Sequence, residues 1–132
     1  MARDVNDNKP QHVIDQVVEA TAKHKSPKIA CLGLAFKPDI DDLRGSPSVE
    51  IVIKLRDLNV GTLYVAEPYI SELPTELRGP NIALMSSREA IKRANIVVLL
   101  VNHKEFKEIV IGALAEKTII DPCGIWYANK NS

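Results

Sequence analysis

The sequence predicts an α/β protein: a doubly wound, mostly parallel sheet of about five to six strands with helices on both faces. Short apolar runs rich in strand-forming residues alternate with segments whose apolar residues recur at helical spacing. The apolar runs are nearly continuous, as in strands that are buried on both faces. The 132 residues, of which 45% are hydrophobic, suffice for one domain of ordinary size.

The individual elements follow from local signals. A first helix is expected after Pro10, with an apolar face over 13–22, and it ends before Pro27. A second helix begins after Ser46, a typical N-cap, with Pro47 at its first position, and buries Ile51, Val52, Leu55 and Leu58. Shorter helices are predicted by Ser86 with Glu89 and by Asn102 with Glu105, and strands over 28–35, 62–68, 82–85, 95–101 and 118–122.

The composition excludes several classes of function. Seventeen basic and seventeen acidic residues give a net charge of +0, so we expect no nucleic-acid or membrane-surface partner. The longest apolar run, 95–101, is too short to span a membrane. The two cysteines, Cys31 and Cys123, are too few for a disulfide scaffold or a zinc site, and we expect a reducing, cytoplasmic setting. The polar opening runs directly into a helical pattern, so we expect a part of a longer protein.

Chemistry is expected in the charged loop 36–46, because open parallel sheets bind ligands beyond the carboxyl ends of their strands. Lys37 supplies a point charge, Arg44 a planar fork, and the helix start at Ser46 offers free N–H groups, a combination that suits a phosphate. The alternative is a solvated loop in which Arg44 pairs with Asp41 or Asp42. A calcium loop is rejected, because Leu43 and Arg44 stand where a ligand and the turn glycine belong. We expect no metal.

The remaining candidates are weaker. His103 is interpreted as a surface histidine that is structural or idle, and Cys31 as inert core. Cys123 follows the last strand at the ligand edge, but no histidine near it in sequence would activate its thiol. It is interpreted as structural or adjacent to the substrate.

Three stretches carry a family resemblance: "GLAFKPDIDDLRGSPS" at 33–48, "ARDVNDNKP" at the start and "IDPCGIW" near the end. They resemble the C-terminal domain of the UDP-glucose/GDP-mannose dehydrogenase family, and the resemblance covers essentially the whole chain. It implies a Rossmann-like, UDP-sugar-binding domain over 27–132, preceded by the end of a central dimerisation helix over 1–26. The longer enzyme would be a homodimer.

The resemblance also implies an activity. The family oxidises the C6 alcohol of a UDP-sugar to a carboxylate in two steps with NAD, and a catalytic cysteine forms the thioester. This chain contains no match to the motif of that cysteine, so we expect no catalytic residue in it and no turnover by it alone. The motifs imply UDP-N-acetyl-D-mannosamine as the substrate, oxidised to the uronate for surface polysaccharides. NAD would be bound mainly by an N-terminal domain.

Site residues follow from the same resemblance. It implies that Phe36 and Lys37 contact the UDP-sugar and that Arg44 reaches the NAD of the first domain. Asp41 and Asp42 would orient Arg44.

Cys123 departs from the family's pattern. It stands where relatives usually carry a basic residue that contacts the substrate, and it supplies no positive charge. The alternatives are therefore a dehydrogenase for another UDP-sugar, or a non-catalytic nucleotide-sugar-binding or interaction module.

Overall fold

A five-stranded, all-parallel sheet forms the centre of the molecule, with the strand order β3-β2-β1-β4-β5. The computed structural model describes residues 9–35, 46–101, 103–109 and 117–120. The strands are β1 (Lys28–Leu32), β2 (Thr62–Ala66), β3 (Ile82–Leu84), β4 (Ile96–Leu99) and β5 (Thr118–Ile120). The predicted α/β fold with a parallel sheet is therefore confirmed.

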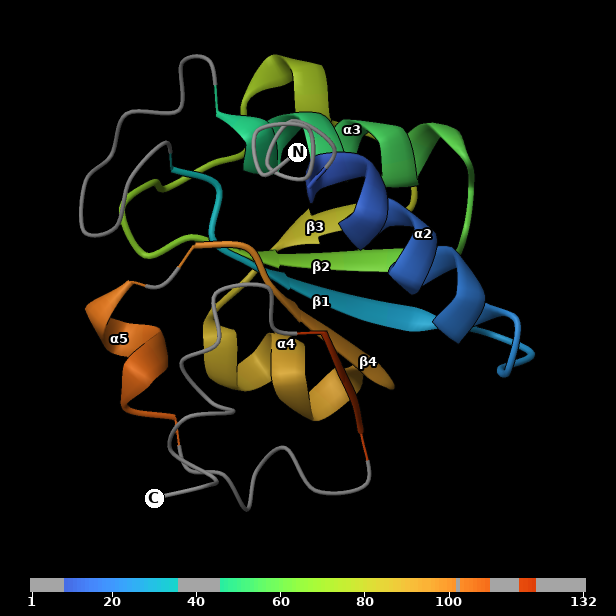
Figure 1. Cartoon of the computed structure of the whole chain (residues 1–132). Helices are drawn as coiled ribbons and strands as arrows, with labels where there is room; N and C mark the ends of the chain where they lie inside the picture. Colours follow the sequence, from blue (N-terminus) through green and yellow to red (C-terminus); the bar gives the residue numbers. More distant parts are fainter. Residues whose placement is uncertain (1–8, 36–45, 102, 110–116, 121–132) are drawn as a thin grey trace, which may run out of the picture.

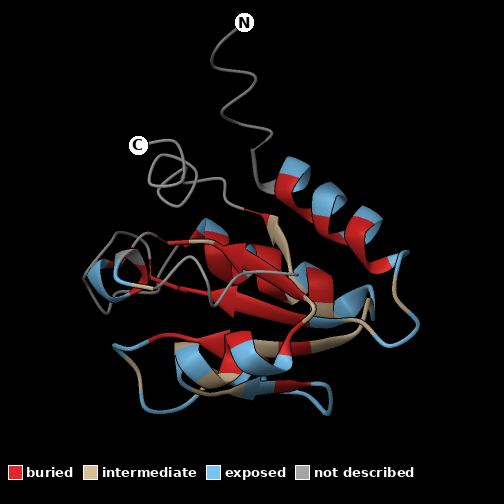
Figure 2. Ribbon diagram, turned by 90° about the horizontal axis from the view of Figure 1, so that it is seen from below, coloured by how far each residue is buried: buried red, intermediate tan, exposed pale blue. Residues whose placement is uncertain are grey.

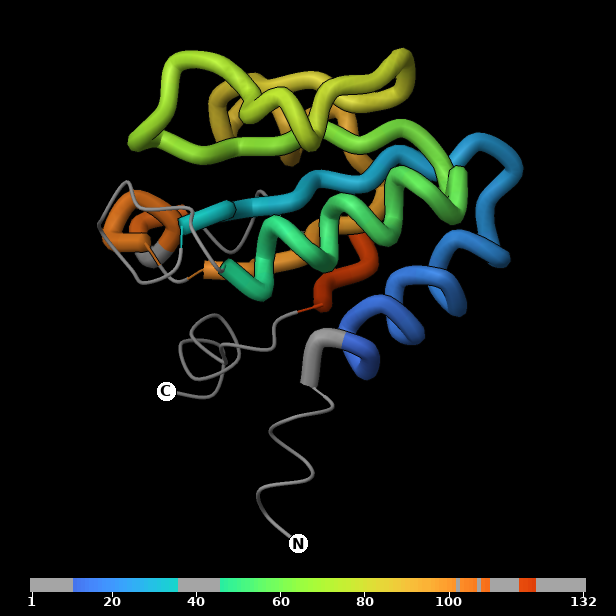
Figure 3. Tube along the Cα trace, turned by 90° about the horizontal axis from the view of Figure 1, so that it is seen from above, coloured from blue at the N-terminus to red at the C-terminus, as the bar shows by residue number. Residues whose placement is uncertain are grey.

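Helices cover both faces of the sheet. Helices α2 (Lys9–Thr21) and α3 (Pro47–Asp57) lie side by side on one face, and α4 (Ser87–Arg93) lies on the other (Figures 1 and 3). The short α5 (Lys104–Lys107) follows β4, and a single 3-10 turn, η1 (Thr75–Leu77), lies between β2 and β3. This arrangement buries the strands on both faces, as their continuous apolar sequences predicted.

Each face of the sheet has its own hydrophobic core. On the side of α2 and α3, Val17 and Leu55 pack with Ile29, Cys31 and other strand residues. On the side of α4, the cluster consists of Ala30, Leu32, Ala66, Ala90, Ile91, Ala94, Val97, Leu99 and Phe106. Figure 2 shows the resulting pattern, with the buried sides of the helices turned toward the sheet and the exposed sides outward. Alternate residues of β1 thus contribute to opposite cores.

Several predicted element boundaries hold. Ser46 caps α3 with its side chain, and Pro47 occupies the first helical turn. Ser86 caps α4 by accepting a bond from the Glu89 N–H at 3.2 Å. Asn59 has a φ of 54°, which ends α3 in the left-handed region.

Other sequence predictions were wrong in detail. Val18, within the apolar face predicted over 13–22, and Leu58, in the predicted buried stripe of the second helix, are 40% and 56% exposed. Leu58 lies at the C-cap of α3, beyond the last turn that contacts the sheet. Strand β1 ends at Leu32 instead of residue 35, because Gly33 has a φ of +101° and turns the backbone out of the strand.

The first helix packs into the core of the sheet domain. Val13, Ile14 and Val17 of α2 are buried in the cluster that contains strand residues. A division at residue 26 between a dimerisation segment and a binding domain stays a prediction. The packing shows that α2 stabilises this domain, whatever else it contacts.

Candidate functional site

The strand order creates a place for a ligand. From β1, the chain builds the sheet outward through β2 and β3 in one direction and through β4 and β5 in the other. In open α/β sheets of this kind, the crevice lies beyond the carboxyl ends of the strands at the point where the direction reverses. Here that point is the end of β1 and β4, so the loops after β1, β2 and β4 define the candidate site.

A buried carboxylate connects these three loops. Glu67 follows β2 and is 3% exposed. Its Oε1 atom accepts hydrogen bonds from the backbone N–H groups of Leu34 at 2.8 Å and Ala35 at 3.0 Å, directly after β1. The same atom lies 2.8 Å from Nε2 of His103, which follows β4. Oε2 accepts from the backbone N–H of Tyr69 at 3.1 Å.

These bonds favour the ionised form of Glu67. Burial acts to raise its pKa, but the hydrogen bonds from His103, Leu34 and Tyr69, together with the charge interaction with His103, outweigh it and leave the pKa below its usual value. An ionised carboxylate only accepts hydrogen bonds, so Nε2 of His103 carries the hydrogen in their contact. The carboxylate therefore acts as a fixed acceptor for donors from three segments.

Aromatic rings enclose the histidine. His103 has no exposed surface. Its ring meets Tyr69 edge-on, with centroids 5.0 Å apart, and Phe106 at a tilt, with centroids 5.4 Å apart. Phe106 is also fully buried, whereas Tyr69 is 43% exposed. The pair of Glu67 and His103 is thus shielded on the inner side, and Tyr69 borders it toward the surface.

Two further contacts shape the end of β1. Gly33 approaches the loop after β4 so closely that an added Cβ would lie 2.6 Å from Cβ of Val101. The hydroxyl of Ser46 donates to the carbonyl of Ala35 at 3.3 Å and accepts from the N–H of Ser48 at 3.2 Å. Ala35 and Ser46 border the segment 36–45 on its two sides, so this bond joins the ends of the charged loop.

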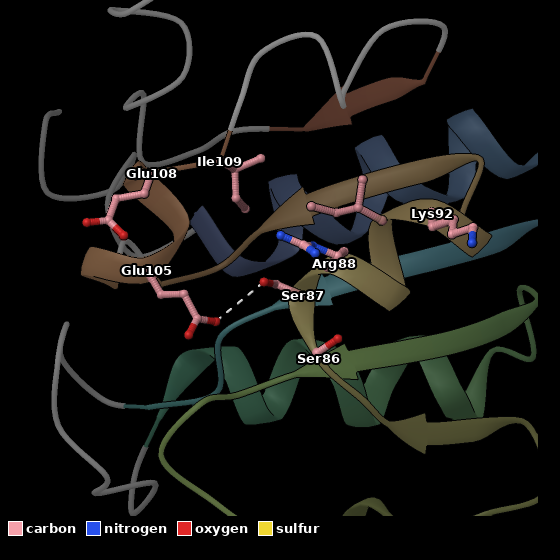
Figure 4. Close-up of a pocket in the computed structure, with 8 residues that line it drawn as sticks. Ser86, Ser87, Arg88, Lys92, Glu105, Glu108 and Ile109 are labelled. Atoms are coloured by element: carbon pink, nitrogen blue, oxygen red, sulfur yellow. Dashed lines mark hydrogen bonds between the residues drawn. The ribbon is translucent and has the colours of Figure 1, made fainter.

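Open grooves flank this region. One of about 430 Å³ lies beside Glu67 and Pro68 at the ends of β2 and β3. A wider one of about 840 Å³ runs between α4 and α5, where Ser87 and Glu105 face each other at 3.4 Å (Figure 4). Glu105 lines both grooves, and exposed charges of both signs surround the wider one. The charged residues that line the smaller groove, Glu67 and Glu105, are both acidic, so neither groove offers a purely basic surface for a phosphate.

The sequence-predicted site residues fall outside the described part of the chain. This holds for Phe36, Lys37, Asp41, Asp42, Arg44 and Cys123. Ala35 and Ser46 fix where the loop containing the first five leaves and rejoins the fold. Their assigned roles remain predictions.

Sequence reasoning misjudged His103 and missed Glu67. His103 was expected at the surface, next to Asn102 as the helix cap. Instead, His103 is buried and stands at the N-cap of α5, where its side chain makes no cap bond. Its ring is turned inward to Glu67, which leaves it unavailable to cap the helix. The signal that could have identified Glu67 is an acidic residue directly after a strand that is buried on both faces.

Two tests for other kinds of site are negative over the described ranges. No helix there is both long and apolar enough to cross a membrane. In the same residues, no cluster of three or more His, Cys, Asp or Glu side chains is arranged to hold a metal ion.

Nucleotide-binding domains commonly have a doubly wound sheet of this kind, with the ligand beyond the carboxyl ends of the strands where the strand order reverses. The chain belongs to the UDP-glucose/GDP-mannose dehydrogenase family: the family's UDP binding domain matches residues 30–128.

Curated relatives cover the chain almost completely. It is 45% identical over 129 residues to an NDP-N-acetyl-D-galactosaminuronic acid dehydrogenase from Ralstonia nicotianae, which covers 98% of this chain and 30% of that protein. It is 50% identical over 109 residues to a UDP-N-acetyl-D-mannosamine dehydrogenase from Campylobacter jejuni, which covers 82% and 27%. The protein of that name from Escherichia coli K12 is 44% identical over 133 residues, covering 95% and 31%. The chain thus spans less than a third of the length of these relatives.

Solved structures agree on the fold. A UDP-glucose dehydrogenase from Pyrobaculum islandicum superposes with a TM-score of 0.73 at 22% identity, covering 89% of this chain and 26% of that one. A UDP-N-acetyl-mannosamine dehydrogenase from Staphylococcus aureus superposes with a TM-score of 0.70 at 24% identity, covering 93% and 29%. At this identity, the two comparisons support the architecture alone.

Proposed function

We propose that this chain is the C-terminal, UDP-sugar-binding domain of an NAD-dependent UDP-sugar 6-dehydrogenase that takes UDP-N-acetyl-D-mannosamine as its substrate. The observation that carries the proposal is the match of residues 30–128 to the family's UDP binding domain. Ala35 and Ser46, which flank the loop 36–45, lie at the switch point of the sheet, and this supports the proposal because ligands of such sheets bind there.

The proposed contacts combine the sequence motif with this location. Phe36 and Lys37 directly follow the residues that Glu67 holds, and they would contact the UDP-sugar. Arg44 would reach the NAD of another domain, with Asp41 and Asp42 beside it. Cys123 would lie near the substrate without supplying a positive charge. The whole enzyme would be a cytoplasmic homodimer that supplies a uronic acid for surface polysaccharides.

The described residues fit a minor role in binding NAD. In dinucleotide-binding domains, the turn after the first strand carries the glycines that bind phosphate. Here Gly33, the first residue after β1, lies directly against Val101, which leaves no room for a phosphate between them. NAD would accept the hydride while held mainly by an N-terminal domain. The contribution of this chain would be Arg44 and the alignment of the sugar.

A second substrate has a specific observation in its favour. A relative with 45% identity over 98% of the chain carries the name of an N-acetyl-D-galactosaminuronic acid dehydrogenase. Both names concern N-acetylated amino sugars, so the choice between them rests on the sugar half of the ligand.

Calorimetric titration of the chain with UDP, UDP-N-acetyl-D-mannosamine and UDP-N-acetyl-D-galactosamine tests the proposal. UDP-ligand binding is expected, and Lys37→Ala should weaken it by at least about tenfold, because a charge-assisted bond to the ligand is lost. Lys23→Ala, at an exposed lysine beyond α2, is the matched control and should leave the affinity unchanged. The absence of binding to all three ligands in the wild-type chain contradicts the proposal.

A further inference from the structure

We infer that Glu67 and His103 are positioning residues that fix the backbone entering the loop 36–45, and thereby set the affinity of the site for the UDP ligand. The role in ligand affinity rests on the proposed function. The role in fixing the backbone stands on the geometry alone.

Leu34 and Ala35 offer two consecutive N–H groups after β1 has ended, so no neighbouring strand satisfies them. Glu67 Oε1 accepts from both, at 2.8 and 3.0 Å, in a fully buried position. Two donors converging on one oxygen restrict the rotation of the peptide between them. The next residue along the chain is Phe36, followed by Lys37.

Glu67 directly follows β2, and its side chain would be free to change rotamer if only the loop after β1 contacted it. His103 Nε2 at 2.8 Å and the Tyr69 N–H at 3.1 Å occupy the two oxygens from other directions. The His103 ring is itself fixed between Tyr69 and Phe106. The acceptor that Leu34 and Ala35 face is therefore held by its own loop, through Tyr69, and by the loop after β4, through His103.

The Ala35 residue that donates to Glu67 also accepts, through its carbonyl, from the hydroxyl of Ser46 at 3.3 Å. Ser46 begins α3, a helix of 11 residues packed on the sheet. Both ends of the segment 36–45 are thus tied to one residue, Ala35, whose N–H is held by the carboxylate. A displacement there would be transmitted to Phe36 and Lys37 through a single covalent link.

Amide hydrogen exchange and NMR spectra of the chain test the positioning role without any ligand. Glu67→Gln replaces one acceptor oxygen by a donor amide, so exchange at Leu34 and Ala35 should accelerate by about tenfold or more. The amide resonances of Phe36 and Lys37 should shift. Val13→Ala, a core change in α2, which makes no described hydrogen bond to Glu67, controls for lost stability, and Glu89→Gln controls for the same chemical change at an exposed carboxylate. Unchanged exchange at Leu34 and Ala35 in Glu67→Gln overturns the inference.

Rescue at His103 separates positioning from general stability. Gln places an N–H donor close to where Nε2 lies, whereas Leu fills the space without a donor. His103→Leu should weaken UDP binding by about tenfold, and His103→Gln should restore most of it. Equal affinities for His103→Leu and the wild type would overturn the link to the ligand. If the wild-type chain binds no UDP ligand, the proposed function fails, while the exchange measurement still decides the positioning role.

Discussion

Gly33 and Val101 lie so close together at the end of β1 that no side chain fits between them. A Cβ on Gly33 would lie 2.6 Å from Cβ and 2.9 Å from the backbone N of Val101, and the φ of Gly33 is +101°. Both the contact and the dihedral exclude other residues. The backbone of β1 and the loop after β4 therefore meet directly at the switch point.

The first prediction concerns this contact. Gly33→Ala should lower the free energy of unfolding by more than about 2 kcal/mol, because backbone strain and the clash with Val101 add. Gly79→Ala is the matched control, since its added Cβ would come closest to the flexible Cδ of Arg56 at 3.3 Å and would make an ordinary contact with Cγ2 of Ile82 at 3.5 Å. It should cost less than about 1 kcal/mol. Urea denaturation of the three proteins measures both values, and similar losses in the two variants would contradict the argument.

The second prediction concerns the stability that Glu67 contributes. Glu67→Gln should reduce the free energy of unfolding at pH 7 by about 3 kcal/mol, because a buried hydrogen-bonded charge is removed from its donors. The pKa of Glu67 in the folded chain lies below its value of about 4.3 in an unfolded chain. The native state therefore prefers the charged form, and its contribution is present above that value and lost as the pH falls through the folded pKa.

The pH dependence gives this prediction a second readout. The difference in unfolding free energy between wild type and Glu67→Gln should shrink as the pH falls below about 4.3 toward the lower folded pKa. Denaturation curves at steps from pH 7 to pH 3 measure it, and Glu89→Gln provides the exposed comparison. A difference that stays constant over this range would show that Glu67 does not titrate with a lowered pKa.

The third prediction compares two helix caps. Ser46 and Ser86 each accept a bond from a backbone N–H at the start of a helix. Ser46 also donates to the Ala35 carbonyl and is buried, so Ser46→Ala leaves a second group unsatisfied. Ser86→Ala should cost about 1 kcal/mol and Ser46→Ala about 2 kcal/mol. Thermal unfolding monitored by circular dichroism ranks them, and the reverse order would contradict the role of Ser46 at the base of the loop.

The fourth prediction concerns the core thiol. Complete burial raises the pKa of Cys31 to about 12, so almost no thiolate forms at pH 8. In a Cys123→Ser background, Cys31 is the remaining cysteine, and its reaction with a disulfide reagent should be negligible until the chain unfolds. A urea series that follows the reaction rate and the secondary structure together tests this. Rapid modification of the native protein would show that β1 opens locally.

Most of the architecture could be predicted from the sequence, because each helix or strand depends mainly on residues that are close together along the chain. The apolar run at 28–32 and the Ser46-Pro47 start predicted β1 and α3 without knowledge of their partners. The error at Val18 has a geometric cause. A helix packed on a sheet at one angle buries a narrower stripe than its apolar residues suggest, and Val18 lies just beyond that stripe.

The centre of the site was harder to predict because it is built from distant residues. Glu67 and His103 are separated by 36 positions, and the donors Leu34 and Ala35 lie a similar distance upstream. Leu34 and Ala35 follow β1, Glu67 follows β2 and His103 follows β4, and nothing in the local sequence of any of them specifies its partner. The parallel sheet was correctly predicted, and it brings the carboxyl ends of its strands to one edge, but the pairing of residues there depends on the order in which β1, β2 and β4 associate.

The central location of β1 has a consequence for synthesis of the chain on the ribosome. One edge of β1 pairs with β2, but the other edge pairs with β4, where Ile29 meets Ile96. Until residue 99 has left the exit tunnel, a growing chain exposes an apolar strand edge that is able to pair with other chains. Nascent chains that end after β3 are therefore expected to depend on chaperones, whereas chains that extend past β4 bury this edge within their own sheet.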